Sequence, residues 1–218
     1  MANGLSALGR AHRALGDPAG ARRLHEEMLG ISRDLGSALW LTDALSEVGQ
    51  DLLALGEREP GLARLEEALA GGGDALEFTV RAHLALADFS LRGGHPEEAL
   101  DRARRFLAAG FEFPVYVAGA RRVEGEALAA LGRTDEAEAV LRCVQAEASA
   151  LGALAPDWEA SLALADLLGA AGRAAEAAHE QARARALLDR VSLEVTDPAL
   201  RASFLATPLV ARGHRAVA

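Results

Sequence analysis

The stretch Leu131-Gly132-Arg133-Thr134-Asp135-Glu136-Ala137 decides the fold. It has the pattern of a helix end, a tight turn at a glycine and the start of a second helix, because glycine adopts the positive φ at which helices stop. Equivalent glycines recur every 38 to 40 residues, at Gly16, Gly56, Gly94, Gly132 and Gly172. Five copies of one helix–turn–helix unit predict a stack of helical hairpins.

Small residues accompany each turn glycine at fixed offsets. Seven residues before it stand Gly9, Gly49, Ala87, Gly125 and Ala165, and five residues after it stand Ala21, Gly61, Ala99, Ala137 and Ala177. A glycine or alanine within a helix lets the facing helix approach closely. The second hairpin is the least regular copy, because Pro60 comes two places later than the proline of the first repeat and Gly61 is a poor helix residue.

The chain is therefore predicted to be all-α, an α-solenoid of five hairpins with a C-terminal capping helix. The expected first helices span about 2–15, 38–55, 75–92, 115–131 and 156–171, and the second helices about 18–35, 60–70, 96–109, 134–151 and 174–192. The repeats would occupy about 1–36, 37–73, 74–110, 111–152 and 153–192. A short helix at about 197–205 would cap the array within residues 193–218, with a frayed end from 212. Three consecutive glycines at 71–73 predict a hinge.

Composition limits the classes of partner and compartment. The formal net charge is −9, and no lysine or arginine run is long enough to follow a phosphate backbone, which argues against nucleic acid and favours a basic protein or peptide. No apolar run reaches the roughly 18–20 residues of a membrane span, and the N-terminus has no signal-peptide core. With the single cysteine Cys143, these features predict a cytoplasmic protein.

The pattern Leu8-Gly9, Gly16, Ala21, Met28, repeated as Gly125, Gly132, Ala137, Val144, resembles the tetratricopeptide repeat (TPR). The resemblance covers about 1–192 and implies a right-handed superhelix that binds partners on its concave face, lined by the first helices. Two departures exist. The period is longer than the usual 34 residues, and His12, Leu52 and Ser90 replace the aromatic residue expected in the first helices of three repeats.

The long period resembles one subset of the family, the C-terminal arrays of bacterial signalling ATPases and of activators of the maltose-regulator type. This resemblance implies a non-enzymatic protein–protein interaction scaffold in a bacterial regulatory system. The alternative is a small-ligand sensor domain of a larger regulator. The first helix is short, so we expect the chain to be a fragment of a longer protein; the alternative is a complete small protein. If it is a fragment, its missing upstream domains are candidate partners, and self-association is a further alternative.

Candidate binding residues follow from the register of the first helices. Positions three before, one after and four after each small residue should face inward. The predicted partner-binding residues are Ser6, Arg10, Arg13, Gln50, Asp88, Arg122, Glu126 and Asp166. The competing interpretation is an ordinary solvated helix face. No catalytic, cofactor or metal site is predicted, because the six histidines form no i, i+4 pair. Phe111, Phe113 and Tyr116 are expected to fill a gap between hairpins rather than to form an exposed hot spot.

Overall fold

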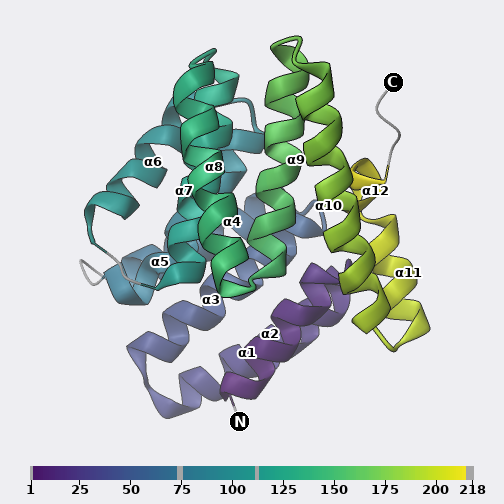
Figure 1. Ribbon diagram of the computed structural model, residues 1–218. Coiled ribbons are helices and arrows are strands. Elements are labelled where there is room, and N and C mark those ends of the chain that lie inside the picture. The colour runs from purple at the N-terminus through teal and green to yellow at the C-terminus, as the bar shows by residue number, and fades with distance from the viewer. Residues whose placement is uncertain (1, 73–75, 111–112, 215–218) are drawn as a thin grey trace. The chain divides into compact units, whose positions relative to one another are not determined.

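The computed structural model describes residues 2–72, 76–110 and 113–214, and this part of the chain is built from helices that pack in consecutive pairs, without a strand (Figure 1). The first helices of the pairs are α1 (Ala2–Ala14), α3 (Ala38–Ala54), α5 (Leu76–Arg92), α7 (Pro114–Ala130) and α9 (Leu154–Ala170). The second helices are α2 (Pro18–Leu35), α4 (Arg58–Gly72), α6 (Pro96–Ala108), α8 (Thr134–Leu151) and α10 (Ala174–Glu194). Two short helices follow, α11 (Pro198–Ala206) and α12 (Pro208–Gly213).

Three details differ from the expected helix bounds. α4 begins at Arg58, two residues earlier than predicted, so Pro60 lies in its first turn, where a missing N–H costs no helical hydrogen bond. α4 also continues through Gly71 and Gly72, so the chain does not break there, and Gly73 lies outside the described residues. One capping helix was predicted, but the described residues form two. Pro208 starts the second, α12, which continues to Gly213, past residue 212 where the frayed end was expected to begin.

The turns confirm the role assigned to the repeated glycines. All five turn glycines have φ between 75° and 83°, where any residue with a Cβ would be strained. At the first turn, the Asp17 carboxylate accepts a hydrogen bond from the backbone N–H of Gly20 at 2.9 Å, and Pro18 opens α2. Glycine thus ends the first helix at every turn, but the side-chain cap is particular to the first turn, since His95, Arg133 and Arg173 at the same place make no side-chain cap hydrogen bond.

Close helix contact explains the small residues before and after each turn. A Cβ built on Gly49 would lie 2.8 Å from Leu65 Cγ and 3.0 Å from the carbonyl oxygen of Gly61, and a Cβ on Gly61 would lie 3.0 Å from the carbonyl oxygen of Gly49. The backbones of α3 and α4 therefore touch. The irregular second hairpin carries glycine at both positions because neither helix has room for a methyl group.

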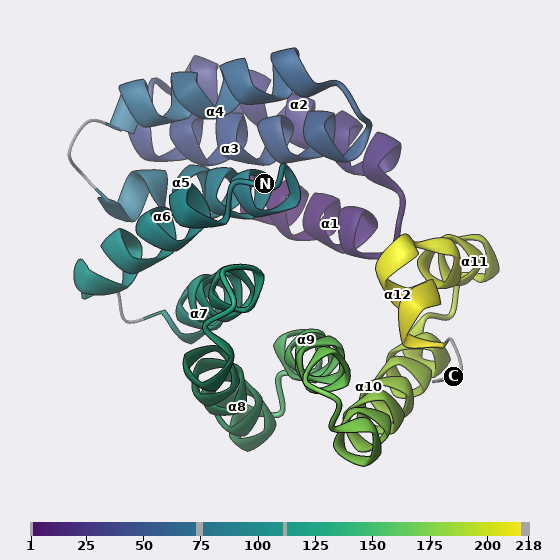
Figure 2. The same ribbon diagram turned by 90° about the horizontal axis from the view of Figure 1, so that it is seen from above.

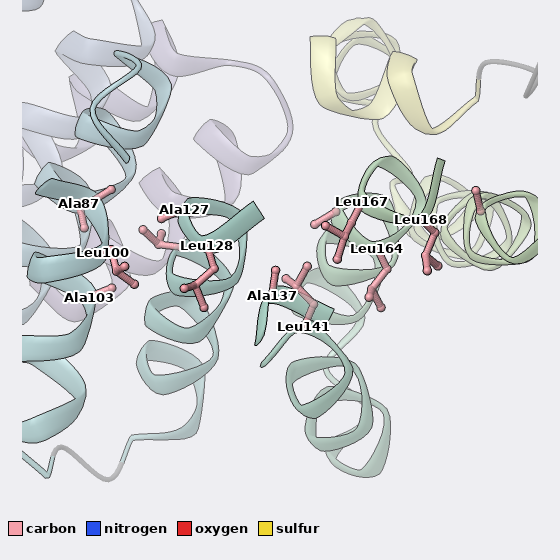
Figure 3. Close-up of a cluster of buried hydrophobic side chains, with 14 residues drawn as sticks. Ala87, Leu100, Ala103, Ala127, Leu128, Ala137, Leu141, Leu164, Leu167 and Leu168 are labelled. Atoms are coloured by element: carbon pink, nitrogen blue, oxygen red, sulfur yellow. The ribbon is translucent and has the colours of Figure 1, made fainter. Parts of the chain in front are cut away.

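The helices form two compact units. The first unit contains Met1–Leu86 and Asp197–Phe204, and the second contains Ala87–Thr196 and Leu205–Ala218, so the boundary falls within α5. Each unit has its own apolar core. That of the first is centred on Met28, Leu45 and Leu65. The core of the second joins α5 to α10 through alanines and leucines such as Leu128 and Leu164 (Figure 3). None of the described helices is both long and apolar enough to cross a membrane.

Candidate functional site

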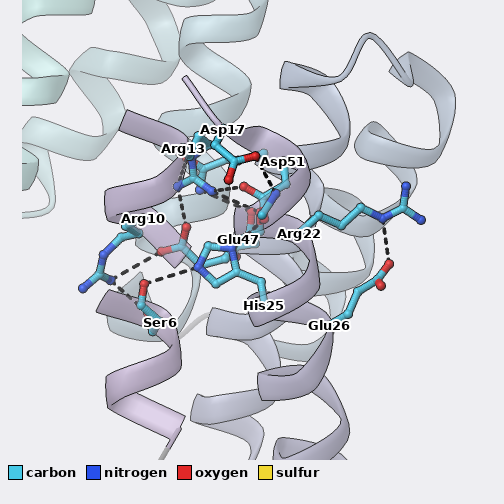
Figure 4. A network of polar contacts seen from close by, with 12 residues as sticks. Ser6, Arg10, Arg13, Asp17, Arg22, His25, Glu26, Glu47 and Asp51 are labelled. Atoms are coloured by element: carbon cyan, nitrogen blue, oxygen red, sulfur yellow. Dashed lines mark hydrogen bonds and ion pairs between the residues drawn. The ribbon is translucent and has the colours of Figure 1, made fainter. Parts of the chain in front are cut away.

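The first helices of the first unit carry a charged cluster, which we call cluster 1. Its cations are Arg10, Arg13 and Arg81, and its anions are Asp43, Glu47 and Asp51. His25 of α2 contacts Asp51 and also belongs to the cluster. Figure 4 shows most of these side chains turned toward one another between α1 and α3. The arginines come from α1 and α5, and the carboxylates from α3, which lies between them in the chain.

Arg13 is the centre of cluster 1. Its Nη2 lies 2.5 Å from Glu47 Oε2 and its Nη1 lies 2.6 Å from Asp51 Oδ1. It also donates to the Gln50 side-chain oxygen at 3.3 Å and to the backbone carbonyl of Glu47. The Glu47 and Asp51 side chains are completely buried, so Arg13 neutralises two charges that have no access to water.

The remaining arginines complete the coordination of Glu47. Arg81 pairs with both Asp43 and Glu47, the second at 2.8 Å. Arg10 lies 3.4 Å from Glu47 and donates to the hydroxyl of the buried Ser6 at 3.1 Å. Three arginines from two helices thus converge on one buried carboxylate of the helix between them.

His25 connects the second helix of the first hairpin to the same cluster. Its Nδ1 lies 2.5 Å from Asp51 Oδ2, and its Nε2 lies 3.3 Å from the backbone carbonyl of Ser6. Both ring nitrogens therefore lie within hydrogen-bond distance of an oxygen atom. The imidazole occupies the space left by Gly9, where a built Cβ would collide with Nε2.

The carboxylates of cluster 1 respond differently to their surroundings. Burial opposes ionisation of Glu47, but Arg13 and Arg81 together outweigh it and lower the pKa of that carboxyl. For Asp43 burial dominates, and the neighbouring Glu47 adds to it, so the pKa of Asp43 is raised despite Arg81. Within cluster 1, the surroundings therefore favour ionisation of Glu47 and disfavour ionisation of Asp43.

A second group, cluster 2, lies on the first helices of the second unit. Arg122 of α7 lies 2.8 Å from Asp88 of α5, 2.6 Å from Glu126 one turn along its own helix, and 3.2 Å from Glu159 of α9. Arg92 also pairs with Asp88, at 2.7 Å. One guanidinium thus bridges the first helices of three consecutive hairpins, and three carboxylates surround it.

Cluster 2 has more negative charge than Arg122 can neutralise. Burial disfavours a charge on Asp88, but Arg122 and Arg92 outweigh it and lower the pKa of Asp88. At Glu159 burial prevails, and the neighbouring carboxylates Asp88 and Glu126 add to it, so the pKa of Glu159 is raised despite Arg122. The Nε of Arg122 is buried and makes no hydrogen bond within the described residues, although Glu159 is its nearest anion.

Asp166 lies on α9 beyond cluster 2, and its side chain is 60 % exposed. Arg212 of α12 pairs with it at 3.0 Å. Burial and the nearby Glu126 nevertheless raise the pKa of Asp166 above its usual value. It is the predicted residue that offers the most surface to a partner.

The structure thus places the eight predicted residues in pairs rather than on a free surface. Ser6, Arg10, Arg13 and Gln50 belong to cluster 1, Asp88, Arg122 and Glu126 belong to cluster 2, and Asp166 pairs with Arg212. Within each unit, most of their charge is directed at a neighbouring hairpin. These contacts show a structural role for the predicted residues; binding of a partner by them stays a prediction.

Sequence reasoning missed the residues one helical turn further back. Asp43, Arg81 and Glu159 each stand six residues before the small residue of their helix. Positions six and three before and one after a reference residue share one helix face. Extending the same register by one turn would have found all three. The buried Glu47 and Asp51 lie off this register, and only the packed structure reveals them.

Phe113, directly before α7, does not fill a gap between hairpins as expected, whereas Tyr116 in the first turn of α7 is partly buried. Phe113 is 63 % exposed. The centroid of its ring lies 6.3 Å from that of the Tyr116 ring, and the two ring planes are inclined at 58°. Phe111 lies outside the described residues. Among the residues that are described, no group of three or more His, Cys, Asp or Glu side chains is arranged to hold a metal ion.

Solved structures of other proteins share this arrangement of helices. A thermophilic TPR protein of Thermus thermophilus aligns with a TM-score of 0.61 and 25 % identity, over 94 % of this chain and 97 % of that one. The structural neighbours are TPR-like repeat proteins. A variant of an array of nearly identical TPR-like repeats, from a kinesin light chain candidate of Podosopora anserina, aligns with a TM-score of 0.57 and 19 % identity, over 88 % and 96 % of the two chains.

These likenesses support the TPR family and the helical-repeat fold. No protein-family model matches the sequence, and no curated protein matches it. The maltose-regulator subset, suggested by the long period, remains a prediction.

Cluster 2 predicts effects of different size for two similar substitutions. Asp88→Asn should lower the free energy of unfolding at pH 7 by about 1.5–3 kcal/mol, because it weakens charged hydrogen bonds from two arginines. Glu159→Gln should cost less than about 1 kcal/mol, since this carboxyl is poorly suited to its negative charge. Urea denaturation of both variants measures the difference.

The same carboxyls predict a pH dependence. Because the pKa of Glu159 is raised, the folded chain retains a proton that the unfolded chain has released, so acidification toward the ordinary carboxyl value of about 4 should stabilise the fold through this residue. Asp88, with its lowered pKa, contributes stability above that value and loses it below. Glu159→Gln should reduce the gain in mild acid without removing it, because Asp43 and Asp166 also have raised pKa values. An unchanged pH profile in this variant would refute the assignment.

Proposed function

We propose that the chain is a non-enzymatic interaction array that docks a basic protein or peptide along the first helices of its second unit. The TPR-like fold fits a protein-interaction scaffold in general, and such folds are typically non-enzymatic. The particular groove and the sign of the partner's charge are our inference from cluster 2.

One observation supports the charge of the partner: carboxylates outnumber cations on this face. The four carboxylates are those of Asp88, Glu126, Glu159 and Asp166, and the three cations are those of Arg92, Arg122 and Arg212. Two of the four, Glu159 and Asp166, have raised pKa values because burial and neighbouring carboxylates act on them together. A lysine or arginine from a partner would favour their ionised forms and satisfy this surplus.

The test uses variants that keep the shape of each side chain. A fluorescein-labelled peptide of alternating lysine and alanine is titrated with the protein, and the fluorescence anisotropy is measured. We expect Glu126→Gln combined with Asp166→Asn to weaken binding about tenfold or more, since each change removes a charge on the docking face. Asp88 is left intact, because it pairs with two arginines, Arg122 and Arg92, and its loss would disturb both.

The matched control is Glu27→Gln combined with Glu66→Gln, which makes the same change of charge at exposed positions in α2 and α4. This control should leave the affinity within about twofold of the parent. Equal weakening in both double variants would mean that only net charge matters, and the proposed docking face would then be wrong.

The regulatory setting rests on the resemblance of the long repeats alone. The alternative, a small-ligand sensor, predicts a thermal shift with a metabolite, since a ligand at 100 times its dissociation constant adds about 2.7 kcal/mol to the stability. The described structure offers no observation that favours this alternative over a docking array.

A further inference from the structure

A groove opens on the opposite, second-helix side of the second unit. Its volume is about 650 Å³, and it lies between α8 and α10. Figure 2 shows α9 set back between these two helices. The residues that line the groove are Arg142, Gln145, Ala146, Ser149, Ala150 and Arg183. None of them belongs to the predicted binding face.

Three of the five α8 residues that line the groove are small. Ala146, Ser149 and Ala150 are exposed and stand at positions i, i+3 and i+4, which share one helix face. Short side chains leave room for another backbone to approach. The α8 side of the groove therefore suits a peptide main chain better than it suits a compact ligand held by large apolar residues.

The groove presents cations to solvent and keeps their anions behind them. The Arg142 side chain is 38 % exposed and its partner Glu180 only 3 %; for Arg183 and Asp157 the values are 35 % and 6 %. Arg142 also lies 3.5 Å from the partly exposed Glu138, but the two guanidinium groups are the charged groups that line the groove. The groove thus has a positive lining on a chain whose net charge is −9.

Both guanidinium groups keep unused donors. Arg183 donates from Nη2 to both oxygens of Asp157, at 2.9 and 3.0 Å, and from Nε at 3.3 Å; its Nη1 makes no hydrogen bond within the described residues. Arg142 bonds Glu180 through Nη1 and Glu138 through Nη2, which leaves its Nε. A guanidinium carries five N–H donors. The buried carboxylates also fix both arginines in place, so binding would order them at little further entropic cost.

We propose that this groove is a second docking site, which takes an acidic peptide segment of a partner protein. Its carboxylates would accept hydrogen bonds from Arg142 and Arg183 while its main chain lies against Ala146 and Ala150. The site goes beyond the proposed function, because it uses the second helices and selects the opposite charge. One hairpin pair would then hold a basic segment on one side and an acidic segment on the other.

The experiment titrates the full chain against a fluorescein-labelled peptide of alternating glutamate and alanine, and against its glutamine counterpart, at about 0.15 M ionic strength. The test variant is Ser149→Glu, which places a carboxylate in the groove without removing either arginine. The control is Ala139→Glu, an exposed position of α8 outside the lining residues. Circular dichroism of both variants verifies that they are folded.

We expect the glutamate peptide to bind and the glutamine peptide to bind at least tenfold more weakly. Ser149→Glu should weaken binding tenfold or more, and Ala139→Glu less than twofold. Equal affinity of the two peptides, equal effects of the two substitutions, or no binding of the glutamate peptide would each overturn the proposal. Because the first-helix site is probed with a basic peptide, failure there leaves this outcome unaffected.

Discussion

Arg13→Ala should lower the free energy of unfolding of this chain by about 3–5 kcal/mol, as expected when one partner of a buried ion pair is removed. The arginine lies between two fully buried carboxylates, Glu47 and Asp51. Without Arg13, the only ion-pair partner left to Asp51 among the described residues is His25. Glu47 loses its shortest ion pair and keeps Arg81 at 2.8 Å and Arg10 at 3.4 Å. Chemical denaturation monitored by circular dichroism measures the loss.

The matched control is Arg22→Ala. Arg22 pairs with Glu26 at 2.7 Å and with Glu57 at 3.0 Å, but all three side chains are well exposed. Exposed pairs contribute about 0–1 kcal/mol, so the control should lose less than that. A similar small loss for Arg13→Ala would show that water reaches Glu47 and Asp51, and cluster 1 would then be a surface network.

Alanine in place of Gly49 should destabilise the chain by about 1–3 kcal/mol, the usual cost of forcing extra atoms into a packed contact. The new methyl group would lie 3.0 Å from the carbonyl oxygen of Gly61, which is backbone and cannot rotate away, and 2.8 Å from Leu65. The helices α3 and α4 would have to separate. The change in the urea midpoint at constant slope measures the loss.

Gly30→Ala provides a control of opposite sign. Gly30 lies within α2, is exposed, and has no atom within 4 Å of a built Cβ. The same substitution there should stabilise the chain by about 0.5–1 kcal/mol, because alanine loses less backbone entropy in a helix. If both variants shifted in the same direction, helix contact would not explain why a small residue stands at position 49.

The hairpins were predictable because their signals are local. A turn glycine such as Gly132 and small residues such as Gly125 and Ala137 act within one helix–turn–helix unit, so the period of the sequence displays them directly. α12 was missed for the opposite reason. Its six residues carry little periodicity, although Pro208 is a local start signal. The contacts that hold it come from α10, where Leu188 lies close to Gly213 and Gln181 donates to the Gly213 carbonyl.

The sequence indicated which helices would carry the charged side chains of the candidate site, but not which of these side chains would pair. The register of the first helices grouped Arg122 with Asp88 and Glu126, which it contacts. It missed Glu47 and Asp51, the acids that Arg10 and Arg13 contact. Which charges would neutralise one another depends on distances between different hairpins, and a single sequence carries no such distances. Glu47 illustrates this limit: a glutamate at its position looks solvated in sequence, yet three arginines enclose it.

The charges that pair between neighbouring first helices alternate in sign from one helix to the next. In the first unit, α1 contributes arginines, α3 carboxylates and α5 Arg81; in the second, α5 contributes Asp88, α7 Arg122 and α9 Glu159. Each hairpin thus complements the charge of its neighbours within its unit, and the modules are not interchangeable. Exchanging two adjacent hairpins within either unit, or duplicating one, would set like charges face to face. The order of the repeats is therefore encoded in charge, while the shape of each repeat is encoded in glycine and alanine.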